Sequence, residues 1–218
     1  MTLIATYIGK YGIIHATDSN VTRVSRPTSG PSATTTAPGK KMFEAPHIAA
    51  GVTVAGSYAV GASDMPTWMN AFIQTRAALP ADTLREFAEA LRTELEQDMT
   101  PKQKRRGSII HIAGYVSDGG TSHPEFWFVR NVHGIDRATG GYTDIRDDFA
   151  ISEDFWSRDY PRDDSYEHGG YYQYANGFPE GRISFMGVHQ CLLQFFTRSG
   201  DSQDGDFDPP LLYRTWRR

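Results

Sequence analysis

The sequence has a single cysteine, no long hydrophobic run and no excess of positive charge, and each absence excludes a class of protein. Cys191 is alone, so the chain can form neither an internal disulfide nor a multi-thiolate zinc site. Lys and Arg number 22 against 26 Asp and Glu, a net charge of −4 that argues against a nucleic-acid-binding surface. We therefore expect a fold held by packing, with no nucleic-acid partner, no metal and no cofactor.

Targeting and membrane signals are also missing. Nowhere do about 18 apolar residues follow one another, and no charged leader precedes an apolar segment at the N-terminus. We expect a cytoplasmic protein without a membrane partner. At 218 residues the chain fits one domain of generous size, so residues 1–218 are predicted to form a single domain.

Hydrophobic periodicity predicts strands in pairs, interrupted by helices. The expected strands are 2–9, 13–17, 41–44, 48–55, 108–116, 125–132 and 211–216. One helix is expected after Asp64 and Pro66, a second after a cap at Asp82, and a third over 183–197. This order predicts an α+β fold with antiparallel, stacked sheets and disfavours a parallel βαβ fold.

Two segments lack a regular pattern. The stretch near 25–39 is dense in Pro, Ser, Thr and Gly, which predicts a mobile surface loop. The stretch near 139–182 mixes acidic and aromatic residues, which predicts an irregular insertion.

Thr2 offers an unusual chemical option. Removal of Met1 would leave one residue that holds both a hydroxyl nucleophile and a free α-amine. Because an α-amino group has a pKa of about 8, a useful fraction is neutral and can accept the hydroxyl proton. Taken alone, Thr2 is better explained as an ordinary strand residue, because threonine is common at the second position of a chain.

Four short motifs together resemble a known family. They are Thr2 with Leu-Ile-Ala, Gly12 to Asp18 and its following Ser, Lys40-Lys41 with Met-Phe-Glu, and the apolar strand ending at Gly56. This combination, in the first third of the chain, resembles proteasome β-type subunits and bacterial proteasome-related peptidase subunits, which are N-terminal-nucleophile hydrolases. The resemblance implies a four-layer αββα sandwich.

The resemblance also implies roles for single residues. Thr2 would be the nucleophile, Asp18 and Lys41 a buried ion pair beside it, and Gly56 the backbone N–H donor to the oxyanion. Ser152 is the nearest candidate for a serine that the family places around the terminal amine. The implied reaction is hydrolysis of peptide or other amide bonds, and the implied partners are further copies in a homo-oligomeric ring or spiral and an ATPase.

Other interpretations remain open. Asp18 could cap a turn, Lys41 could be a solvated strand-end charge, and Gly56 could simply end a strand. The main alternative is a catalytically silent proteasome-fold subunit with a structural or recognition role. An acylase for small amides would share the Thr2 nucleophile and differ only in its pocket.

Overall fold

The computed structural model describes residues 4–9, 12–17, 20–25, 33–79, 83–118, 121–136, 141–153, 171–176 and 212–216. The strands are β1 (Ile4–Gly9), β2 (Gly12–Thr17), β3 (Asn20–Ser25), β4 (Ala33–Pro38), β5 (Met42–Ala45), β6 (Ala50–Gly56), β7 (Ala59–Val60), β8 (Ser63–Asp64), β9 (Ser108–Asp118), β10 (Thr121–Ile135), β11 (Tyr142–Glu153), β12 (Tyr171–Asn176) and β13 (Leu212–Trp216). The helices are η1 (Pro46–Ile48), α1 (Met65–Ala77), α2 (Leu84–Asp98) and α3 (Pro101–Lys104).

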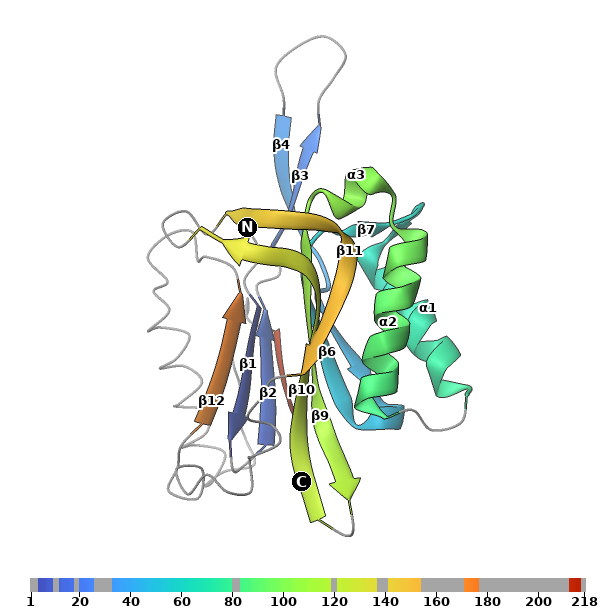
Figure 1. Ribbon diagram of the computed structural model, residues 1–218. Coiled ribbons are helices and arrows are strands. Elements are labelled where there is room, and N and C mark those ends of the chain that lie inside the picture. The colour runs from blue at the N-terminus through green and yellow to red at the C-terminus, as the bar shows by residue number, and fades with distance from the viewer. Residues whose placement is uncertain are drawn as a thin grey trace.

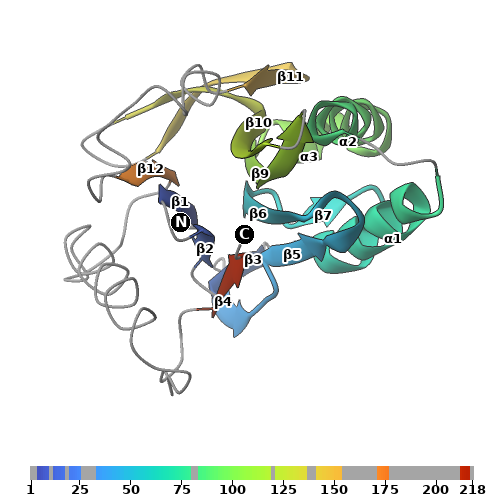
Figure 2. The ribbon, with the colours of Figure 1, turned by 90° about the horizontal axis from the view of Figure 1, so that it is seen from below.

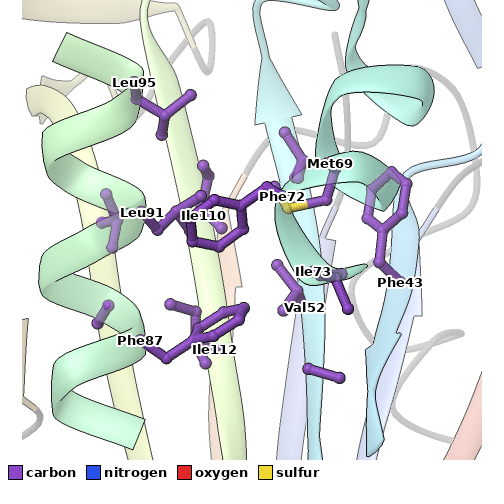
Figure 3. Packing of buried hydrophobic residues seen from close by; sticks show 14 of the residues in the cluster. Phe43, Val52, Met69, Phe72, Ile73, Phe87, Leu91, Leu95, Ile110 and Ile112 are labelled. Carbon is purple, nitrogen blue, oxygen red and sulfur yellow. The ribbon is translucent and has the colours of Figure 1, made fainter. Parts of the chain in front are cut away.

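A five-stranded antiparallel sheet in the order β11-β10-β9-β6-β5 forms the centre of the described structure. Helices α1 and α2 pack on one face of it (Figure 1). Figure 3 shows Leu91 and Phe87 of α2 directed at β9 and at Phe72 of α1. Burying such a side chain contributes about 1.5–3 kcal/mol, so this layer contributes substantially to stability.

A four-stranded antiparallel sheet, β12-β1-β2-β13, lies against the other face. Figure 2 shows β1 and β2 beside β6 and β9. Two buried apolar clusters join the sheets. One contains Ile8, Ile13, Ala113 and Phe126, and the other contains Ile4, Ala55, Ile109 and Val132.

Most of the predicted elements are confirmed. The hairpins β1–β2, β5–β6 and β9–β10 and the strand β13 lie where the sequence predicts them. Asp64 caps α1, its Oδ1 accepting the Thr67 N–H at 2.9 Å, with Pro66 in the first turn. The predicted helix over 183–197 lies outside the described residues.

The N-cap of α2 is one residue later than predicted. Thr83, and not Asp82, caps the helix: its hydroxyl accepts the Glu86 N–H at 3.1 Å, and the Glu86 carboxylate accepts the Thr83 N–H at 2.8 Å. This reciprocal pair satisfies two N–H groups, whereas a single cap at Asp82 would satisfy one, so the capping box decides the start.

Both segments predicted to be irregular contain strands. Within 25–39, β4 pairs with β3 in a hairpin that projects from the rest of the structure (Figure 1). Three successive threonines, Thr34 to Thr36, favour the extended conformation despite the flanking Gly and Pro. Within 139–182, β11 pairs with β10 and β12 pairs with β1. β4 and β11 pair with the strand that precedes each of them in the chain, whereas β12 pairs with β1, which lies far away in the sequence.

The fold class is α+β with antiparallel sheets, as predicted. Within the described ranges α1 and α2 cover only the five-stranded sheet, so the four-layer sandwich stays a prediction. No helix in the described part of the chain is long and apolar enough to cross a membrane.

Candidate active site

Thr2 and Asp18 lie outside the described residues, but their nearest described neighbours lie opposite each other. Ile4, two residues after Thr2, and Thr17, immediately before Asp18, are Cα partners across β1 and β2. Both are buried. Ile4 and Thr17 therefore mark the end of this hairpin that lies nearest in the sequence to Thr2 and Asp18.

Lys41 is buried at the entry to β5, with 3% of its surface exposed. Its backbone carbonyl accepts the Val54 N–H at 2.9 Å, which fixes it beside β6. Burial of a lysine ammonium costs several kcal/mol unless a negative charge compensates it. Lys41 is therefore not the solvated strand-end charge that the alternative interpretation describes, and its burial fits a paired role.

Gly56 occupies a backbone conformation that requires glycine. Its φ is +101°, and a Cβ built there would lie 2.1 Å from the carbonyl oxygen of Gly107. That same oxygen accepts the Ser57 N–H at 2.9 Å, so the close approach is part of the end of the β6–β9 ladder. The structural need for glycine thus has a local cause that is independent of any catalytic role.

The alternation of N–H groups along β6 indicates on which side the Gly56 N–H lies. Successive N–H groups of a strand in an antiparallel sheet alternate between its two neighbours. Since the Val54 N–H donates to Lys41 on the β5 side, the Gly56 N–H faces that side too, beyond the start of β5. This N–H therefore faces away from β9.

The two sheets bring these positions together. Ile4 packs in one buried cluster with Ala55, the residue before Gly56. The end of the β1–β2 hairpin that leads to Thr2 and Asp18 therefore lies over the end of β6. Lys41 and Gly56 belong to the same end of the five-stranded sheet.

Ser152 is not brought into this group by the sheet register. It is half-buried on β11 and pairs with Phe128 of β10. Across the sheet, Phe128 pairs with His111 of β9, and His111 pairs with Thr53 of β6. Gly56 pairs with Ser108, three residues away along β9, and β11 is three strands from β6. At about 4.8 Å per strand, this is a lateral separation of about 14 Å.

A buried polar cluster between the sheets was not predicted. The Thr6 hydroxyl lies 3.1 Å from Nδ1 of His15 and 3.1 Å from Nδ1 of His111, and all three side chains are buried. The signal was present in the sequence, because each histidine interrupts an apolar strand at a position whose neighbours two residues away face the core.

The protein environment keeps both imidazoles neutral. Burial lowers the pKa of His15 to about 4, although the backbone carbonyl of Ala113 acts in the opposite direction. Burial also holds the pKa of His111 well below its usual value, and the nearby His15 lowers it further. Within the described ranges, no group of three or more His, Cys, Asp or Glu side chains is placed to hold a metal ion.

Asn131 holds the turn that precedes β9. Its Oδ1 accepts the Ser108 N–H at 2.7 Å, and its Nδ2 donates to the carbonyls of Lys104 and Arg146, each at 2.8 Å. This amide uses both of its polar ends in a fully buried position. It thereby fixes the turn whose Gly107 carbonyl contacts Gly56 and Ser57.

Comparison with protein-family models gives no match, and comparison with curated proteins gives none either. Among solved structures, the chain is similar to a Gly-1 mutant of Anbu from Hyphomicrobium sp. strain MC1, a bacterial proteasome-related N-terminal-nucleophile hydrolase. The identity is 12%, the TM-score is 0.43, and the match covers 100% of this chain and 82% of that one. The two backbones differ too much for residue roles to be transferred between them.

Proposed function

We propose that this chain is a proteasome-type threonine hydrolase that cleaves peptide or other amide bonds. Removal of Met1 exposes Thr2 as the nucleophile. The observation that supports the proposal is the meeting of four strand ends, marked by Ile4, Thr17, Lys41 and Gly56, at one end of the interface between the sheets.

The reaction follows from these groups. The Thr2 α-amine takes the hydroxyl proton while the oxygen attacks the amide carbonyl. A positive charge on Lys41 disfavours a second positive charge on the Thr2 amine. The pKa of that amine is therefore lowered, and a larger fraction of it is neutral and able to accept a proton. The Gly56 N–H donates to the developing oxyanion, an interaction that contributes about 3 kcal/mol in comparable sites.

Collapse of the tetrahedral intermediate expels the amine of the substrate, which takes the proton from the Thr2 ammonium. The acyl group stays on Thr2 as an ester. Water, deprotonated by the Thr2 amine, hydrolyses this ester and restores the free hydroxyl. Asp18 is assigned to compensate the buried Lys41 charge. Assembly into a ring or spiral, an ATPase partner and the outer helical layer remain predictions from the resemblance.

Intact mass of the purified protein, before and after a threonine-directed epoxyketone probe, tests the proposal. We expect loss of Met1 and one probe adduct. Thr2→Ala removes the adduct, whereas Thr36→Ala, which changes an exposed threonine of β4, keeps it. Retained Met1 without an adduct would instead support the silent structural subunit.

A further inference from the structure

The interface between the two sheets is apolar at both sides of one polar bridge. Along β1, Ile4, Thr6 and Ile8 face the five-stranded sheet in turn. Ile4 packs with Ile109 and Ala55, and Ile8 packs with Ala113 and Phe126. Between these clusters the Thr6 hydroxyl lies within hydrogen-bond distance of His111. One hydrogen bond, which depends on direction, thus lies between two apolar clusters, which do not.

The hydrogen bonds among Thr6, His15 and His111 fix which nitrogen atoms carry a hydrogen. The Thr6 hydroxyl carries one hydrogen and faces two Nδ1 atoms, each at 3.1 Å. It can donate to one imidazole and must accept from the other. His15 and His111 are therefore held as opposite tautomers, and the three groups form a chain of hydrogen bonds from β2 through β1 to β9.

No backbone ladder connects β1 to the five-stranded sheet, since β1 pairs only with β2 and β12 among the described strands. Apolar contacts resist separation of the sheets, but the free energy of burying apolar surface has no direction of its own. A hydrogen bond does resist sliding. The Thr6–His111 contact is a side-chain hydrogen bond that links β1 directly to β9, and a hydrogen bond between His15 and the Ala113 backbone links the neighbouring strand β2 to β9.

We propose that Thr6, His15 and His111 form a positioning unit that sets the location of the N-terminal nucleophile relative to the Gly56 donor. Thr6 is four residues from Thr2 along the chain, about 13 Å when extended. His111 is three residues from Ser108, which pairs with Gly56. The bridge thereby links the strand that leads to the nucleophile with the strand pair that carries the oxyanion donor. This inference depends on the proposed function.

Thr6→Val tests the unit because it keeps the shape of the side chain and removes the hydroxyl. We expect kcat for amide hydrolysis, and the rate of Thr2 labelling by the epoxyketone, to fall about 10- to 100-fold with KM changed less than about twofold, since a shift of about 1 Å has an effect of this order. Thr6→Ser restores the hydroxyl and should return kcat to within about threefold of the wild type.

Ile8→Val is the matched control, because it lies on the same strand and the same face and removes only one methylene. It should lower the melting temperature without lowering kcat. Equal losses of kcat in Thr6→Val and Ile8→Val, or an unchanged kcat in Thr6→Val, would overturn the positioning role.

Crystal structures of these two variants give a readout that does not need activity. We expect Ile4 to shift relative to Ala55 in Thr6→Val and not in Ile8→Val. An unshifted β1 in Thr6→Val overturns the positioning unit even if the wild type is active. A wild type that takes no probe adduct overturns the proposed function, and that result is recognised independently of the shift.

Discussion

Single residues at the candidate site are constrained by their immediate surroundings. Gly56 has a positive φ, and the Gly107 carbonyl oxygen lies 2.1 Å from the position that a Cβ would occupy. Lys41 is buried beside it, and its charge needs compensation. Both observations are independent of the sequence resemblance.

Gly56→Ala is expected to lower the free energy of unfolding by about 2–4 kcal/mol, because the added methyl overlaps the Gly107 carbonyl oxygen and φ is unfavourable for any L side chain. Urea denaturation measures the loss. Gly61→Ala is the control: its φ is +57°, and an added Cβ would lie 3.2 Å from the Asp98 carbonyl oxygen, so we expect a loss of about 1 kcal/mol. Similar losses in the two variants would contradict this explanation of Gly56.

At the scale of elements, the sequence signals were reliable for α1, α2 and the hairpins β1–β2, β5–β6 and β9–β10, whereas the hairpin β3–β4 was missed. Alternation defined the paired strands, and the spacing of Leu84, Phe87, Leu91 and Leu95 defined the buried face of α2 (Figure 3). Boundaries were less certain, because neighbouring residues compete for the same role. Asp82 and Thr83 both suit an N-cap, and only the reciprocal partner Glu86 selects Thr83.

Thr83→Ala should lower the free energy of unfolding by about 1 kcal/mol, since it removes the hydroxyl that accepts the Glu86 N–H. Thermal unfolding followed by circular dichroism measures it. Thr75→Ala, at an exposed position near the end of α1, should change stability by less than about 0.5 kcal/mol. A Thr83→Ala variant as stable as Thr75→Ala would show that the capping box does not stabilise α2.

At the scale of the whole molecule, the contact between the two sheets determines how the β1–β2 hairpin lies relative to Lys41 and Gly56 of the candidate site. This contact is built from side chains, and its polar centre is the bridge of Thr6, His15 and His111. Two neutral imidazoles buried together make the contact sensitive to protons, because a charge on either one would be desolvated.

Stability should therefore fall as the pH falls from about 6.5 to about 4. Above this range His15 is neutral in both the folded and the unfolded state. Within it, the unfolded chain binds a proton at the ordinary pKa of about 6.5, whereas the folded His15 has a pKa of about 4. The contribution of His15 present at pH 7, about 3 kcal/mol, is lost across this window.

Urea denaturation at a series of pH values measures this dependence. His15→Gln should make the profile between pH 6.5 and 4 less steep, while the buried His111 retains part of the slope. Thr75→Ala, which removes no titratable group, should leave the profile unchanged. Parallel profiles for the wild type and His15→Gln would contradict the proton linkage.

The sequence by itself determined the paired strands, the two helices, the α+β class and a set of candidate residues, because these depend on periodicity, caps and short motifs. Only the tertiary structure decided that β12 joins β1 and that Ile4 meets Ala55. It also revealed that His15 and His111 share one hydroxyl. The physical reason is that pairing between distant strands and burial between sheets depend on neighbours that lie far apart along the chain, and local patterns do not specify those neighbours.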